Sequence, residues 1–95
     1  MVKGVILVDL TDQGRRTIKE SPDRAEASKA EAAKLGVQVK DLFYTPGGPH
    51  DAAILIEAEG PESINKLMSR IQSLGNVKMK FVRAFSIEEM RKMVQ

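Results

Sequence analysis

The stretch TPGGPHD, from Thr45 to Asp51, contains the residues whose types are best suited to chemistry. His50 is the only histidine in the chain, and an aspartate follows it directly. A histidine titrates near neutral pH and a carboxylate can orient its ring, so such a pair has the parts of a general acid and base. Adjacent residues of a strand point to opposite faces, however. A catalytic pair would therefore require the loop to turn, or a partner from elsewhere in the fold.

The same stretch also has a structural interpretation, which we favour. Gly47 and Gly48 supply the backbone freedom that a tight turn needs, and an aspartate such as Asp51 commonly caps backbone amides. A catalytic role for His50 and Asp51, or a ligand-binding role for this loop, remains the alternative.

Arg83 and Tyr44 are the other candidate ligand-binding residues, together with Asp51. Arg83 shares the alternation of the last predicted strand with Phe81, which directs a charge toward an apolar face. There it would clamp an anionic ligand or pair with a carboxylate such as Asp51 or Asp9. Tyr44 would place a hydroxyl near the same cavity, or lie at the edge of the core.

The elements that position these residues follow from periodicity and from turn and cap signals. Ser21 is an expected N-cap and Pro22 suits a first helical position, and Asp41 marks a possible bulge in an extended segment. Apolar residues at spacings of three and four predict a second helix, which ends at Gly75. The expected elements are a strand at 5–8, a helix at 22–35, strands at 37–45 and 52–59, a helix at 61–74, a strand at 76–85 and a helix at 86–95 with a capping box.

This β-α-β-β-α-β order predicts a ferredoxin-like α+β fold in one domain spanning residues 1–95. Four antiparallel strands would have two helices on one face and a helix at the C-terminus. The first strand is apolar on both sides, and Ala53 and Leu55 lie opposite Ile54 and Ile56. Two helices cover only one face, so we predict a homodimer in which the sheet of a second chain covers the other.

Composition narrows the classes of function. The 95 residues include no cysteine and one histidine, so we expect no disulfide, no dedicated metal site and no cofactor. No segment approaches the length of a membrane span, and we expect a cytoplasmic protein. PGGPHD lacks the lysine and hydroxyl residue of a phosphate loop, and no nucleophile elbow is present. The third strand, AAILIEAE, has no aromatic residue on which RNA bases would stack, so we expect no nucleic-acid partner.

Several short motifs in order resemble the GYD domain family. They are LTDQG after the first strand, ESPDRA at the first long helix, a strand ending IEAEG, then SLGNVK and VRAFSIEEM. The resemblance implies a dimeric ferredoxin-like fold, in a dimeric α/β-barrel assembly, and no established activity. It also aligns the family's signature glycine, tyrosine and aspartate with the hairpin loop, where this chain has His50 in place of the tyrosine and retains Asp51.

Two functions remain open at this point. The first is a non-catalytic or sensor-like homodimer that binds a small molecule in a cavity near the sheet or the dimer interface. The second is a cofactor-independent enzyme, such as an oxygenase, isomerase or dehydratase, that uses His50, Asp51 and Arg83. An enclosed pocket lined by these three side chains would favour the enzyme.

Overall fold

A four-stranded antiparallel sheet forms the centre of the structure, a computed structural model that describes residues 1–95. The strand order is β2-β3-β1-β4, so the two strands that are consecutive in sequence form a hairpin, and the first and third lie in the middle. The strands are β1 (Val2–Leu10), β2 (Val37–Tyr44), β3 (Ala52–Ala58) and β4 (Val77–Arg83).

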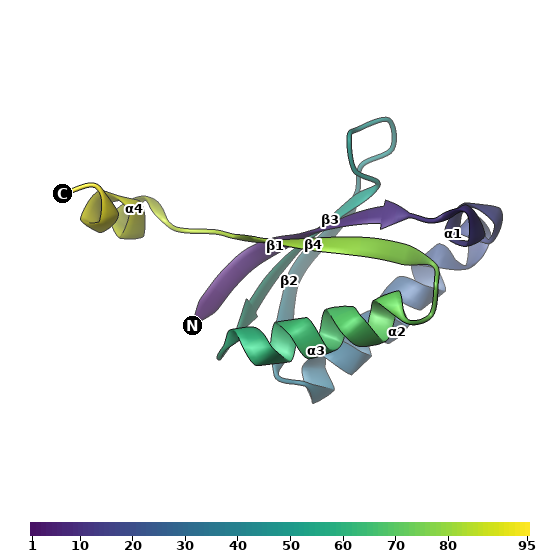
Figure 1. Ribbon diagram of the computed structural model, residues 1–95, viewed down its shortest axis with the longest axis horizontal. Coiled ribbons are helices and arrows are strands. Elements are labelled where there is room, and N and C mark those ends of the chain that lie inside the picture. Colours follow the sequence, from purple (N-terminus) through teal and green to yellow (C-terminus); the bar gives the residue numbers. More distant parts are fainter.

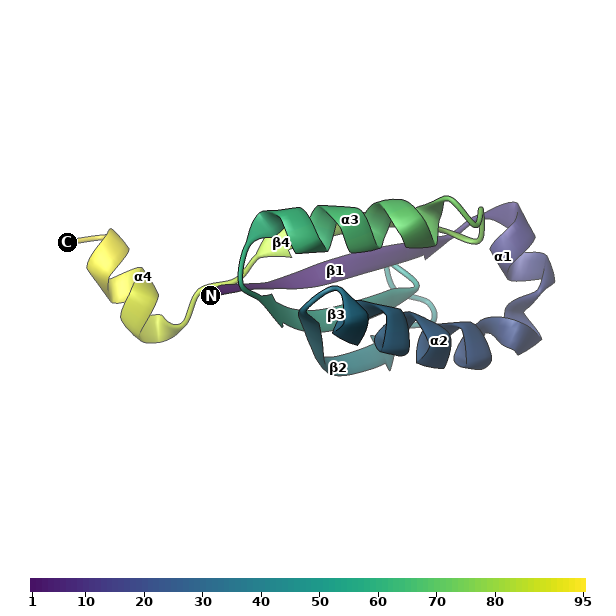
Figure 2. The same ribbon diagram turned by 90° about the horizontal axis from the view of Figure 1, so that it is seen from below.

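Two helices cover one face of this sheet, as the edge-on and underside views show (Figures 1 and 2). The predicted ferredoxin-like α+β fold is therefore confirmed. The first strand is longer than predicted, and a short helical segment joins it to the first long helix. The helices are α1 (Asp12–Arg16), the 3-10 turn η1 (Ile18–Glu20), α2 (Ser21–Lys34), α3 (Pro61–Gln72) and α4 (Ile87–Met93).

The core lies between the sheet and the helices α2 and α3. Alternate residues of β1 and β3 are buried there, and the most deeply buried large side chains are Ile6, Ile56, Ile64 and Val37. Full burial of such a side chain stabilises the fold by about 1.5–3 kcal/mol. Gly4 belongs to the same face, where a Cβ would stand 2.2 Å from the Phe81 ring, so a glycine lets this ring lie against the strand.

The expected N-cap role of Ser21 is wrong. Ser21 has helical backbone angles, φ −58 and ψ −44, because the 3-10 turn η1 leads directly into α2. The N-cap position is occupied by Glu20, whose side chain makes no capping bond. The Ser21 hydroxyl is consequently free to bond outside its own helix, and it meets Tyr44.

The predicted bulge in β2 is present, between Val39 and Asp41. Val39 lies on the helix side before the bulge, and Leu42 and Tyr44 lie on that side after it, opposite the buried Ile54 and Ala52. A bulge adds one residue to one strand, so the residues that follow it exchange faces. The inward-facing residues of β2 are therefore odd-numbered before the bulge and even-numbered after it. The Tyr44 ring is thereby directed toward α2.

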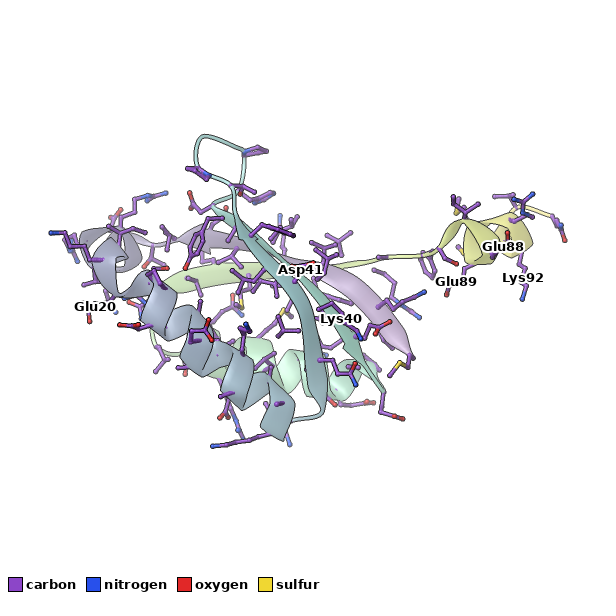
Figure 3. The ribbon with its side chains drawn as sticks, turned by 180° about the vertical axis from the view of Figure 1, so that it is seen from behind. Glu20, Lys40, Asp41, Glu88, Glu89 and Lys92 are labelled. Carbon is purple, nitrogen blue, oxygen red and sulfur yellow. The ribbon has the colours of Figure 1, made fainter.

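The other face of the sheet has no helix over it. Its centre is apolar, and Leu55, Phe43 and Val82 are 41%, 54% and 48% exposed. Val5 and Leu7 complete this face, which we call the open face. Charged residues flank its centre, among them the Lys40–Glu57 ion pair, and Figure 3 shows Lys40 on β2 beside Asp41.

Helix α4 extends away from the rest of the molecule, beyond the end of β4 (Figures 1 and 2). The predicted capping box at its start is present, because Ser86 and Glu89 satisfy each other's backbone amides. One side-chain link ties it to the sheet, from Lys3 Nζ to Glu89 Oε1 at 2.6 Å. No helix in the structure is long and apolar enough to cross a membrane.

The contacts of Glu89 make the position of α4 sensitive to acid. Hydrogen bonds from the Lys3 ammonium and the Ser86 amide lower the pKa of Glu89 from 4.5 to about 2. A carboxylate whose pKa is lowered by folding stabilises the folded state above its unfolded pKa, and that contribution is lost as pH falls toward the folded pKa. We expect α4 to remain attached near neutral pH and to loosen between about pH 4.5 and 2.

The variant E89Q should reproduce the loosening at neutral pH, measured as faster amide hydrogen exchange in α4. E88Q is the matched control, because Glu88 is a carboxylate of the same turn that contacts only Arg91, at 3.7 Å. Equal exchange rates in the two variants would contradict a tethering role for Glu89.

Candidate functional site

The loop between β2 and β3 is a compact turn that projects beyond the ends of these two strands, on the side away from the helices (Figure 1). The amide of Thr45 donates to the carbonyl of Asp51 at 2.9 Å, and the Thr45 hydroxyl donates to the carbonyl of His50 at 2.6 Å. Gly47 has a φ of 83°, in the region that favours glycine. The loop is thus held by its own backbone and by a threonine.

His50 and Asp51 bond to different partners and not to each other. His50 Nδ1 lies 3.0 Å from Asp9 Oδ1. Asp51 Oδ2 accepts a hydrogen bond of 2.8 Å from the Leu10 amide, just beyond the end of the β1–β3 pairing. Both carboxylates therefore hold the loop against the end of β1.

Arg83 lies far along the sheet from these two residues. It pairs with Gly4 near the start of β1, whereas His50 and Asp51 contact the end of that strand. Its guanidinium stands over the Phe85 ring, 5.3 Å from the ring centroid, and it makes no salt bridge. A single chain does not bring Arg83 together with the loop.

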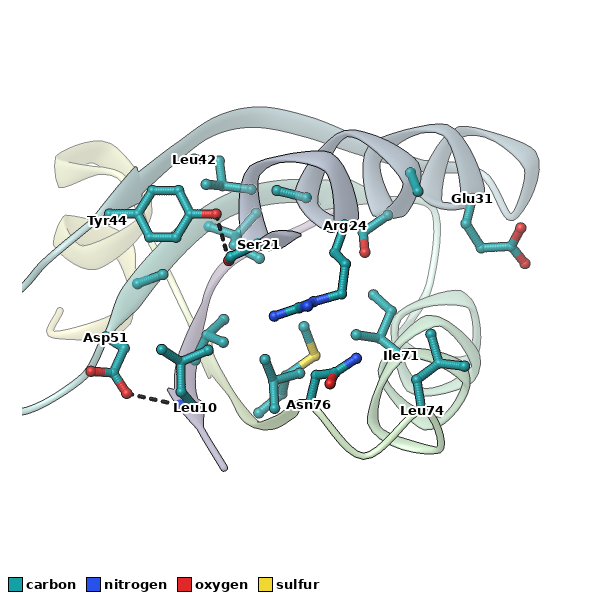
Figure 4. A pocket seen from close by; sticks show the side chains of 18 of the residues that line it. Leu10, Ser21, Arg24, Glu31, Leu42, Tyr44, Asp51, Ile71, Leu74 and Asn76 are labelled. Carbon is teal, nitrogen blue, oxygen red and sulfur yellow. Dashed lines mark hydrogen bonds between the residues drawn. The ribbon is translucent and has the colours of Figure 1, made fainter. Parts of the chain in front are cut away.

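A cavity of about 420 Å³ lies between α2, α3 and the helix side of the sheet (Figure 4). We call it the helix cavity. Of its 19 lining residues, 12 are hydrophobic, so its wall is mainly apolar. The apolar side chains come from all four strands and both helices, and include Val8, Leu42, Ile54, Ile71 and Met79. Tyr44 and Asp51, two of the predicted ligand-binding residues, line it, and Arg83 does not.

The polar groups of the helix cavity are few and mostly paired. The hydroxyls of Ser21 and Tyr44 are 2.9 Å apart. At the rim, Arg70 of α3 forms an ion pair with Glu31 of α2. The Asp51 carboxylate is held by the Leu10 amide, as the dashed line in Figure 4 shows.

Arg24, another polar residue of the wall, is only partly paired. Its Nη1 donates to the carbonyl of Thr17 at 3.2 Å and to the hydroxyl of Thr17 at 3.0 Å. Its Nη2 is buried and has no hydrogen-bond partner. In Figure 4 the guanidinium extends from α2 into the space between the two helices.

Sequence reasoning missed the polar residues that α2 presents to the helix cavity. Ser21, Arg24, Ser28 and Glu31 recur at intervals of three or four residues, which places them on one side of a helix. This polar stripe, beside the alanines that also face inward, was the available signal. The alanine-rich composition of the segment drew attention to close packing instead.

The geometry suits binding of a small organic molecule more than acid–base chemistry. Ligand sites are usually concave and mainly apolar, with a few placed polar groups and a volume of about 300–1,000 Å³. The helix cavity has each of these features. No group of three or more histidine, cysteine, aspartate or glutamate residues is arranged to hold a metal ion.

The fold and the helix cavity define a class of small ferredoxin-like proteins with a pocket between the helices and the sheet. The GYD domain model matches residues 5–94. This chain therefore belongs to the GYD domain family, and the resemblance seen in its motifs is confirmed.

One relative carries a descriptive name. A protein of Thermus thermophilus called "Glutamine synthetase and cystathionine beta-lyase binding protein" is 29% identical to this chain over 87 residues, which cover 90% of each sequence. No solved structure gives a significant match.

Proposed function

We propose that this protein is a homodimer that binds a small organic molecule in the helix cavity of each subunit. The observation that carries the ligand-binding part is the mainly apolar cavity of about 420 Å³ between α2, α3 and the sheet. Well-packed protein interiors contain few voids larger than a water molecule, so an apolar space of this size beside a core is a candidate binding site.

The open face supports the homodimer. An apolar patch on the surface of a monomer costs free energy in water and promotes aggregation, and a second sheet packed against it would remove that cost. The two faces of a symmetric dimer are the same surface. The open face suits such packing, because its exposed apolar residues are grouped at its centre and charged residues lie around them.

A larger side chain that fills the helix cavity should prevent a ligand from binding there. Ala25 lines the cavity, and A25F would place an aromatic ring in it. We expect the fluorescent dye 8-anilinonaphthalene-1-sulfonate, an anion with an aromatic body, to bind the wild type and to bind A25F at least tenfold more weakly, measured by fluorescence titration. A30F is the control, since Ala30 belongs to the same helix but is exposed and outside the cavity. Equal binding to the two variants would contradict the proposed site.

A charge on the open face should separate the dimer. We expect the wild type to have twice the 10.5 kDa chain mass and L55E to have the mass of one chain, because two buried glutamates would face each other across the interface. Light scattering after size exclusion at micromolar concentration measures this. I18E, which changes an exposed apolar residue on the helix side, should remain dimeric. A wild type of monomeric mass would refute the homodimer.

The enzyme alternative has weaker support. It requires His50, Asp51 and Arg83 at one site, and in a single chain they lie at different ends of the sheet. It would need the subunits to be arranged so that Arg83 of one approaches the loop of the other.

We propose a second function from the named relative, which is binding to metabolic enzymes. The relative's name states that it binds glutamine synthetase and cystathionine beta-lyase. In this chain, α4 offers a projecting surface for such a contact. Its apolar side chains are largely exposed, with Ile87 at 77% and Met93 at 58%.

Binding of this chain to the two enzymes can be measured directly. Purified glutamine synthetase and cystathionine beta-lyase from the organism that encodes this chain would be immobilised, and binding of the chain measured by biolayer interferometry. We expect I87E to weaken binding at least tenfold, because it places a charge on the apolar surface of α4. E88Q, a change beside it on the same helix, should have little effect. Absence of binding by the wild type to both enzymes would refute this function.

A further inference from the structure

One nitrogen of the Arg24 guanidinium is buried without a hydrogen-bond partner beside the helix cavity. An arginine carries its charge at every physiological pH, and a buried charge is costly unless it is paired and hydrogen-bonded. Nη1 is satisfied by Thr17, so it anchors the start of α2 to the segment before it. Nη2 contributes nothing to that anchor, is buried, and has no acceptor.

The chain offers no anion of its own to Arg24. Of the two carboxylates that line the helix cavity, Glu31 pairs with Arg70 and Asp51 accepts from the Leu10 amide. Arg24 takes part in none of the salt bridges of the structure. The arrangement thus lacks one acceptor, at the end of a side chain that enters the helix cavity (Figure 4).

We infer that the helix cavity binds a small carboxylate with an apolar body, and that the carboxylate accepts a hydrogen bond from the Arg24 guanidinium. This inference rests on the proposed ligand-binding function and adds the class of ligand. The apolar body would lie along the wall formed by Leu42, Ile71 and Met79. A charge-assisted hydrogen bond is among the stronger polar contacts in proteins.

A single carboxylate fits the available donors better than a phosphate group. A phosphate monoester carries a charge of about −1.5 to −2 and has three strongly accepting oxygens. The helix cavity supplies one unpaired guanidinium nitrogen, the paired hydroxyls of Ser21 and Tyr44, and the single hydroxyl of Ser28. Ser21 is three residues before Arg24 on α2, so its hydroxyl lies on the same side of the helix as the arginine. Two carboxylate oxygens can be satisfied by such a set.

Three eight-carbon probes separate the contributions of charge and apolar body. Octanoate has the carboxylate, 1-octanol has the same chain without charge, and octyl phosphate carries the larger anion. Binding to the full chain would be measured by isothermal titration calorimetry at constant ionic strength. We expect octanoate to bind the wild type about tenfold more tightly than 1-octanol, in line with one charge-assisted hydrogen bond.

The preference for octanoate should depend on Arg24 alone. In R24M, which keeps an apolar stem of similar length, octanoate and 1-octanol should bind equally. R16M is the matched control, since Arg16 is an exposed arginine of the neighbouring α1, and it should keep the tenfold preference. If R24M fails to fold by circular dichroism, R24Q replaces it with the same expectation.

The outcomes distinguish the ligand class from the proposed function. Equal binding of octanoate and 1-octanol to the wild type would overturn the carboxylate and leave the cavity as a binding site. A preference that survives in R24M would overturn the role of Arg24, and tighter binding of octyl phosphate would overturn the choice of a carboxylate. Failure of all three probes to bind would overturn both the carboxylate and the cavity as a ligand site.

Discussion

Two helices cover one face of a sheet whose central strands are apolar on both faces, and most of the molecule follows from this imbalance. The covered face holds the deeply buried residues, with Ile6 and Ile56 from the two central strands. The uncovered face retains Val5, Leu55 and Val82 in contact with solvent. Hydrophobic burial is the dominant favourable term in folding, so the uncovered face is the part of the surface with most to gain from a second chain.

The covered face is itself filled unevenly, which leaves the helix cavity. Ala32, near the end of α2, is fully buried against the core, whereas Ala25 and Ser28 nearer its start line an open space. Their side chains are too short to reach α3 and the sheet. Arg24 crosses part of this space and ends in it with one nitrogen unpaired. An arginine with a purely structural role would be expected to pair every buried donor. The missing hydrogen bond at Arg24 is therefore the most informative polar feature of the fold.

The features predicted from the sequence were those fixed by short-range patterns. The alternation in AAILIEAE predicted which residues of β3 are buried. The pair Ser86 and Glu89 predicted the capping box of α4. The bulge near Asp41 was visible because the apolar alternation changes phase there. Ser21 failed as an N-cap because its signal is local, and the 3-10 turn before it extended the helical backbone past the expected start.

The sequence by itself determined the strand and helix order, the hairpin, and the presence of an apolar face that two helices would leave uncovered. Only the tertiary structure decided which side chains share a site. His50 meets Asp9, 41 residues away, and Arg24 lines a cavity with Tyr44 and Asp51, while Arg83 lies apart from them. Periodicity specifies the face on which a side chain lies, but not its distance along the sheet from residues of other strands. That distance depends on strand register and helix packing, which arise only when the whole chain folds.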